Sequence, residues 1–350
     1  MEQNSTLTTE EIVVPESKPC IGCGNPDVLK GYPNALCASC RQYYIKYPIP
    51  LWVKAFGGGI AILVVVLLFN LPKTLMPEIY FEKGIAAAKQ HKYATAQRYF
   101  TKAANAAPGF YQAQAELLIA AFYNEDKVVV SKMAKALSTR NFEDEELLAK
   151  VNKTMDYATT YFAADSLLAL AAQHPDSTGG LTPPILQQYI AKYPADNYAK
   201  ILLTSILYNA KEYVKADSVV KVVLQNDPVY QPALEMAVAL NRMLNKTKDA
   251  LNYCDRLLAI NKENVYAIAN QGRINLKMNN YKDGLVYARK ATNTNDTDAY
   301  AKTTLILAYH FNKMIKERDE LIKDANNIKQ GEMPDRLQFV LDVINHKDSL

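Results

Sequence analysis

Residues 77–109, PEIYFEKGIAAAKQHKYATAQRYFTKAANAAPG, decide the fold of most of this 350-residue chain. Small residues at Gly84 and Ala96 would let two helices approach each other closely. Phe100 would fill the groove between the helices, and Pro108 would end the second helix because proline cannot continue it. The stretch therefore predicts a helix–turn–helix pair.

The same pattern recurs downstream at intervals of about 34 residues, which is the mark of a repeat architecture. The matching positions are Ala216, Val220, Val223 and Pro228, then Ala250, Cys254 and Leu257, then Gly284, Ala288 and Ala291. Each second helix would open with a tyrosine, at Tyr93, Tyr213 and Tyr281. Because Tyr93 and Tyr213 are not a whole number of periods apart, we predict an irregularity near residues 177–196, at the segment STGGLTPP.

The order of aromatic, small and proline positions resembles the tetratricopeptide repeat (TPR). The resemblance implies an all-α, TPR-like α-solenoid over residues 77–345, ending in a closing helix near 334–345. It also implies a concave groove, lined by the first helices, that binds a protein or peptide. The residues expected in that groove are Phe81, Tyr198, Ile201, Tyr208, Arg242, Tyr266, Arg273, Tyr300 and Phe311.

Some members of this family grip the terminal carboxylate of a peptide with lysine and asparagine side chains. The comparable positions here are Ile85, Ser205, Ala239 and Arg273, so the resemblance does not extend to that mode of binding. Cys254 occupies the place that Phe100 holds in the first repeat, and we expect a small buried hydrophobic residue rather than a reactive thiol.

Four of the five cysteines crowd into two CxxC pairs, Cys20–Cys23 and Cys37–Cys40, with thirteen residues between them. Two such turns facing each other form a tetrahedral site of four sulfurs, which favours zinc or an iron–sulfur species. CIGCG and LCASC resemble the zinc-ribbon family, which implies a structural zinc module over residues 20–48 after a flexible N-terminus, residues 1–19. Two disulfides in an exported segment are the alternative.

Residues 51–71, LWVKAFGGGIAILVVVLLFNL, form the one stretch long and apolar enough to cross a bilayer. Thiolate ligands persist most easily in a reducing compartment. We therefore expect a single-pass membrane protein with its zinc ribbon in the cytoplasm. The repeats would be extracytoplasmic, facing the periplasm from a bacterial inner membrane, and the acidic start of the chain argues against a signal peptide.

The formal net charge of +4 does not favour nucleic-acid binding, and the motifs HExxH, GxSxG, GxGxxG and GxxxxGK[ST] are absent. We therefore expect no enzyme but a membrane-anchored scaffold that docks protein partners on its repeats. One alternative is a membrane-tethered regulator whose zinc ribbon binds a cytosolic protein or nucleic acid. Another is an enzyme with a site in the groove that no motif reveals.

Overall fold

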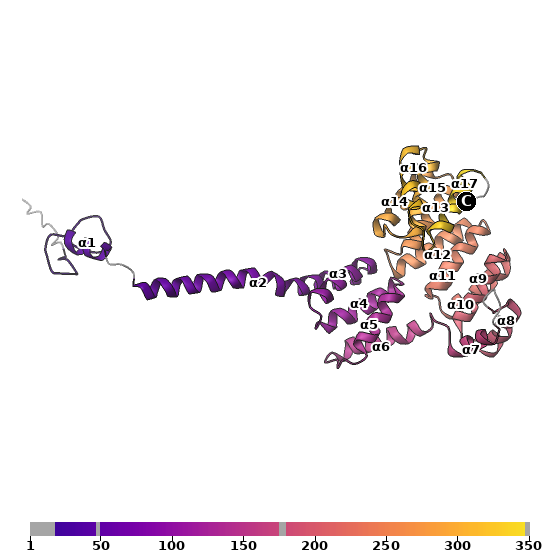
Figure 1. The fold of residues 1–350 in the computed structure, drawn as a ribbon, viewed down its shortest axis with the longest axis horizontal. Coiled ribbons are helices and arrows are strands. Elements are labelled where there is room, and N and C mark those ends of the chain that lie inside the picture. The colour runs from indigo at the N-terminus through magenta and orange to yellow at the C-terminus, as the bar shows by residue number, and fades with distance from the viewer. Residues whose placement is uncertain (1–17, 47–49, 175–179, 347–350) are drawn as a thin grey trace, which may run out of the picture. The chain divides into compact units, whose positions relative to one another are not determined.

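The structure, a computed structural model, describes residues 18–46, 50–174 and 180–346, except for the side chains of residues 67–74. The chain divides into two compact units, Met1–Pro72 and Lys73–Leu350. Regular secondary structure is helical throughout the described residues (Figure 1), which confirms the predicted all-α class.

In the first unit, residues 20–37 form turns, bends and irregular segments and are followed by α1 (Ala38–Lys46). The described residues 18–46 contain no β-strand, so "zinc ribbon" remains a resemblance of sequence only. Pro26, Gly31 and Pro33 lie in the connecting segment, where proline and glycine favour turns over paired strands.

Helix α2 (Leu51–Lys89) covers the predicted membrane span 51–71 and continues into the first repeat, so the domain boundary expected near residues 71–77 lies inside a helix. A proline within a helix removes one backbone hydrogen bond, and α2 continues through Pro77. Among the described residues, no helix has a stretch that is both long and apolar enough to cross a membrane. Residues 67–71 of the predicted span fall outside the described side chains.

The second unit consists of helices that mostly pack as antiparallel neighbours (Figure 1). After α2, the early helices are α3 (Tyr93–Ala106), α4 (Tyr111–Tyr123), α5 (Lys127–Leu137), α6 (Glu145–Thr159), α7 (Asp165–Gln173) and α8 (Pro183–Lys192). The later helices are α9 (Asn197–Asn209), α10 (Tyr213–Asn226), α11 (Gln231–Met243), α12 (Thr247–Ile260), α13 (Val265–Lys277), α14 (Tyr281–Thr294), α15 (Ala299–Phe311), α16 (Ile315–Asn326) and α17 (Met333–Ile344).

The 34-residue period of the sequence is the period of the structure. Successive first helices begin one full period apart, at Asn197, Gln231, Val265, Ala299 and Met333. The turn inside each pair holds one residue in the left-handed conformation, again at the same interval, at Lys211, Asn245, Asn279 and Lys313. Tyr93, Tyr213 and Tyr281 each begin a second helix, as predicted. The second unit is therefore a TPR-like solenoid.

The irregularity predicted near residues 177–196 lies between α7 and α9. Its first residues, 177–179, fall outside the described residues. The rest contains α8, a helix outside the 34-residue phase that packs against α9.

Close helix packing depends on the small residues of the repeat. A Cβ atom added to Gly84 would lie 2.5 Å from Cε1 of Phe100, and one added to Gly284 would lie 2.5 Å from Cδ2 of Leu276. Cys254 is fully buried in the equivalent place to Phe100, and burial raises the pKa of its thiol to about 12. The expectation of a buried residue at this position is confirmed.

The first helices of the later repeats contact one another directly: α9 with α11, α11 with α13, α13 with α15, and α15 with α17. We call these five helices the first-helix row. Because α17 begins in phase with the other first helices, it covers the end of the row as a closing helix does in stacked repeats.

Candidate functional site

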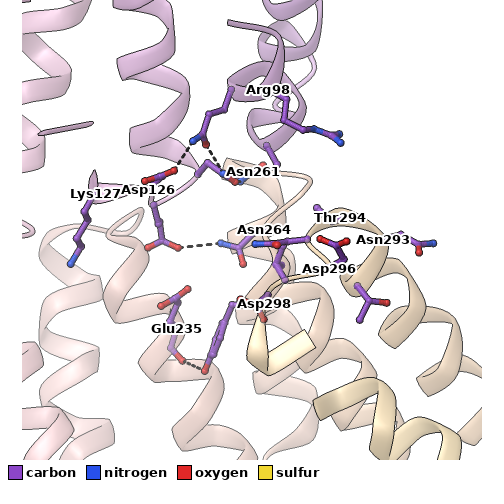
Figure 2. A pocket seen from close by; sticks show the side chains of 18 of the residues that line it. Arg98, Asp126, Lys127, Glu235, Asn261, Asn264, Asn293, Thr294, Asp296 and Asp298 are labelled. Carbon is purple, nitrogen blue, oxygen red and sulfur yellow. Dashed lines mark hydrogen bonds between the residues drawn. The ribbon is translucent and has the colours of Figure 1, made fainter. Parts of the chain in front are cut away.

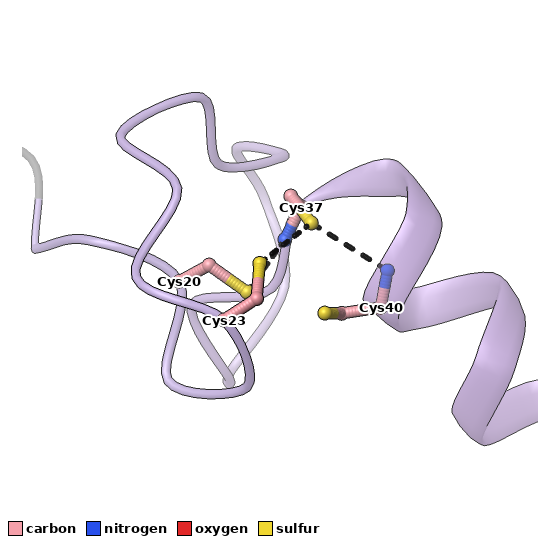
Figure 3. A group of neighbouring side chains, drawn as sticks. All are labelled: Cys20, Cys23, Cys37 and Cys40. Atoms are coloured by element: carbon pink, nitrogen blue, oxygen red, sulfur yellow. Dashed lines mark hydrogen bonds between the residues drawn. The ribbon is translucent and has the colours of Figure 1, made fainter.

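The four clustered cysteines come from two segments that the fold brings together (Figure 3). Cys20 and Cys23 lie on a turn, whereas Cys37 precedes α1 and Cys40 lies in its first turn. The Ile21 amide donates a hydrogen bond of 2.9 Å to the Ala35 carbonyl and joins the two segments. Gly24 has a φ of 75°, the left-handed conformation expected of the residue after the turn.

The spacing of the sulfur atoms fits a metal ion bound by four thiolates. All four lie within 4.8 Å of one another, and the sulfurs of Cys23 and Cys37 are 3.6 Å apart. Thiolates at about 2.3 Å from a tetrahedral zinc ion would lie about 3.8 Å from each other. All four cysteines are free thiols in this structure. The cluster can therefore hold a metal ion and is compatible with zinc.

The cluster shifts the pKa values of two of its thiols in opposite directions: hydrogen bonds with Cys23 and Cys37 raise the pKa of Cys40 to about 12, whereas a backbone amide favours the ionised form of Cys20. The Cys37 amide donates to the Cys20 sulfur at 3.2 Å, and this hydrogen bond lowers the pKa of Cys20 to about 6. A Cβ atom at Gly22 would lie 3.2 Å from the Cys40 sulfur, so the turn needs a residue without a side chain there. The cysteine segment is thus shaped around the four sulfurs.

Five of the residues expected in the groove lie together on the first-helix row. We call them the arginine–tyrosine cluster: Tyr208, Arg242, Tyr266, Arg273 and Tyr300. Arg242 Nη1 donates to the Tyr300 hydroxyl at 2.6 Å, and the Arg273 guanidinium lies 4.0 Å from the centre of the Tyr300 ring. The rings of Tyr266 and Tyr300 stack with their centres 5.2 Å apart.

Members of the cluster differ in accessibility. Arg273 and Tyr300 are buried, whereas Tyr208, Arg242 and Tyr266 are half-buried and can contact a bound molecule. Burial acts to raise the pKa of Tyr300, but the guanidiniums of Arg242 and Arg273 outweigh it, so the pKa is lowered. The cluster therefore has a strongly positive local field.

The other four expected groove residues lie apart from this cluster and pack against neighbouring helices. The Phe81 ring lies 4.9 Å from that of Phe110, and the Phe311 ring stacks 5.5 Å from that of Tyr281. Tyr198 and Ile201 pack, partly buried, against the core around Leu203, as Tyr208 and Tyr266 of the cluster also do. These four side chains contribute to packing in the structure.

Two turns of the repeat array that are far apart in the sequence also contact each other, and no sequence motif marks this contact. We call it the closure. The Lys262 amide donates to the His91 carbonyl at 2.8 Å, so the α12–α13 turn meets the α2–α3 turn. Glu263 accepts hydrogen bonds from the Thr95 amide at 2.8 Å and the Thr95 hydroxyl at 2.7 Å. Because Lys92 supplies no side-chain cap, Glu263 caps the N-terminus of α3 from a distant repeat.

Replacing Glu263 by alanine should weaken this closure. Loss of a helix cap costs about 1 kcal/mol, which corresponds to roughly 2–4 °C in the melting temperature of a domain of this size. Hydrogen exchange should report faster exchange of the Thr95 amide. The matched change Glu320→Ala, at an exposed site on α16, should alter neither quantity; equal effects of both variants would contradict the capping role.

The closure creates an open cavity of about 1290 Å³ between α3, the α4–α5 turn, α11, and the turns that precede α13 and α15 (Figure 2). Its lining is rich in acids: Glu125, Asp126, Glu235, Asp296, Asp298 and Glu332, against Arg98, Lys102 and Lys127. Tyr266, a member of the arginine–tyrosine cluster, also lines this cavity. The cavity was not expected from sequence because its walls come from distant repeats.

Two of these acids, Glu125 and Glu235, influence each other's ionisation. Burial raises the pKa of both, and the proximity of Glu125 raises that of Glu235 further. The Asn264 side chain donates to Glu125 at 3.4 Å, and Lys127 partly offsets the shifts. The folded state therefore favours a proton on this pair.

Replacing Glu235 by glutamine should stabilise the protein near neutral pH. When a carboxyl has a higher pKa in the folded state, the protein loses folding stability as the pH rises through that pKa. The loss is absent below the usual pKa of glutamate. We expect a gain of about 1–3 kcal/mol near pH 7.5, vanishing near pH 4. Thermal melts across this range, with Glu320→Gln as control, would contradict the account if the gain did not depend on pH.

Comparison with known proteins gives weak likenesses. No family model and no curated protein matches the chain. Among solved structures, MamA protein is 15% identical, with 48% of this chain and 86% of that chain covered and a TM-score of 0.34. YrrB, described as a TPR protein with an unusual peptide-binding site, is also 15% identical, with 48% and 87% covered and a TM-score of 0.34. PilF of Pseudomonas aeruginosa is 13% identical, with 77% and 98% covered and a TM-score of 0.31. The TPR-like description of this chain rests on its own 34-residue geometry.

Proposed function

We propose that this protein is a membrane-anchored scaffold that binds a protein segment on the first-helix row. The observation that carries the proposal is the cluster of half-buried Tyr208, Arg242 and Tyr266 on adjacent helices of that row. Tyrosine and arginine combine a large contact area with polar ends, and both are enriched where proteins bind one another. The proposed role is binding rather than catalysis.

A pull-down of the tagged full chain from a detergent extract tests this role. The variant Tyr208→Glu places a charge on the first-helix row, and Val214→Glu places the same charge on α10 at a side chain that is 71% exposed. We expect a specific protein to co-purify with the wild type and with Val214→Glu but not with Tyr208→Glu. Equal recovery with both variants, or no specific protein, would contradict the proposal.

We also propose that residues 51–71 anchor the chain in a membrane. Support comes from the apolar side chains of α2 that project into solvent in the isolated chain, including Trp52 at 71%, Phe56 at 67% and Ile62 at 67% exposed. A helix that exposes apolar groups all round needs an apolar environment. The proposed topology keeps residues 1–50 in the cytoplasm and residues 72–350 in the periplasm.

Membrane attachment and topology can be tested together. The full chain should resist alkaline carbonate extraction, and a reporter after Leu350 should be active only on the periplasmic side. Recovery of the chain in the soluble fraction would contradict the anchor. Activity of the reporter in the cytoplasm would contradict the orientation alone.

The first unit offers a second candidate function, as a cytosolic docking module held together by zinc. Ile21 is 72% exposed on the cysteine turn and Ile45 is 71% exposed on α1, which favours a protein partner over nucleic acid. Ile21→Ser should then abolish a cytosolic interaction without loss of the metal. Retention of every interaction by Ile21→Ser would rule out this candidate.

A further inference from the structure

Positive charge gathers on three helices of the first-helix row, largely without matching negative charge. Arg242 lies on α11, Arg273 and Lys277 lie on α13, and Arg336 lies on α17. Within the described part of the chain, Arg336 pairs with Glu332 at 2.7 Å, but the other three side chains form no ion pair. Buried or half-buried charges are normally paired, so this arrangement requires an explanation.

Arg273 shows the imbalance most clearly because its side chain is 3% exposed. Its Nε donates to the Thr304 hydroxyl at 2.8 Å, and one Nη2 hydrogen goes to the Thr303 hydroxyl at 3.0 Å. These neutral oxygens satisfy hydrogen bonds but do not neutralise the charge. Burial lowers the pKa of Arg273 to about 10, and the nearby Arg242 acts in the same direction.

Arg242 and Lys277 bring this charge to the surface, since both are half-buried. Arg242 Nη1 donates to the Asn270 side chain at 2.9 Å as well as to Tyr300. Lys277 Nζ donates to the Arg242 carbonyl at 3.2 Å, and both burial and Arg242 lower its pKa. An anion beside Arg242 and Lys277 would supply the negative charge that this part of the row lacks.

We propose that Arg242 and Lys277, backed by Arg273, form a binding site for acidic side chains of a protein segment. This inference rests on the proposed function and names the chemistry of the partner. A nucleic acid fits less well, because its phosphates continue in both directions. Glu235, two turns before Arg242 on α11, and Asp298, the N-cap of α15, would repel a long polyanion on the same row.

The test uses the purified full chain in a nonionic detergent and two fluorescein-labelled peptides with amidated carboxyl ends. One peptide carries two neighbouring glutamates in an otherwise uncharged sequence, and the other has glutamine in place of both glutamates. Fluorescence anisotropy should show binding of the glutamate peptide alone, weakened by added salt. Because the peptides lack a terminal carboxylate, binding must come from their side chains. A labelled oligonucleotide tests nucleic acid as the competing class of ligand.

Lys277→Gln should weaken binding of the glutamate peptide at least about tenfold, whereas Lys282→Gln, at an exposed site on α14, should leave it unchanged. Arg242→Gln should act like Lys277→Gln if circular dichroism shows it folded. Equal binding of the glutamine peptide, tighter binding of the oligonucleotide, or full binding by Lys277→Gln would overturn the inference. If the glutamate peptide does not bind but recovery of the pull-down partner still depends on Tyr208, only the assignment of acidic side chains is wrong. If neither result is obtained, the proposed function is wrong as well.

Discussion

Replacement of Cys37 by serine is expected to unfold residues 20–46 and to leave the melting of the repeat array unchanged. The only buried apolar side chains that the structure describes in this segment are Cys20 and Cys37, so packing alone supplies little stability. A structural zinc ion bound by four thiolates contributes about 10–16 kcal/mol to the folding of a small module. Removal of one ligand should therefore eliminate both metal and fold.

Elemental analysis and hydrogen exchange measure the two consequences. The wild type should carry stoichiometric zinc, and Cys37→Ser should lose it while amides of residues 20–46 exchange rapidly. Cys254→Ser removes a thiol that lies outside the cluster and should retain the zinc. Undiminished zinc in Cys37→Ser, or unchanged protection of these amides, would refute a four-cysteine structural site.

Gly84→Leu is expected to disrupt the first repeat through overpacking. Even a Cβ atom there would lie 2.5 Å from the Phe100 ring, which is fully buried. Overpacking of this kind costs about 1–3 kcal/mol, or roughly 2–12 °C in melting temperature for a domain of this size.

Gly109→Leu is the matched control, because an added Cβ atom there meets nothing within 4 Å. It should change the melting temperature by much less than Gly84→Leu does. Equal destabilisation by the two variants would contradict the close approach of α2 and α3. Tyr198→Ala, which a purely groove-lining role would make harmless, should instead lower stability because Tyr198 packs against the core.

The repeat could be predicted from sequence because its physical cause is local. Tyr93, Tyr213 and Tyr281 mark helix starts, and the small residues at Gly84 and Gly284 mark close helix contacts. The cysteine cluster could be predicted for the same reason, since two CxxC turns carry their own geometry. The residues in the left-handed conformation, such as Lys211 and Lys313, could not be predicted, because no single residue type occupies this position in the turn between the two helices of a pair.

Features that depend on distant contacts could not be predicted. The closure between His91 and Lys262 joins two turns whose contact leaves no signal in the sequence, so the cavity that it creates could not be predicted either. Arg273 and Tyr300 lie on the expected row, but the closing helix α17 and neighbouring side chains bury them. Continuation of α2 past Pro72 was also unexpected, because proline usually marks the end of a helix.

Site-specific photo-crosslinking tests most directly whether partners bind on the first-helix row. A photoreactive amino acid at Tyr208 is compared in cells with the same group at Val214 on α10. The account predicts a discrete crosslinked product from position 208, lost when Lys277→Gln is added, and none from position 214. The same products from both positions, or a product from position 214 alone, would contradict it.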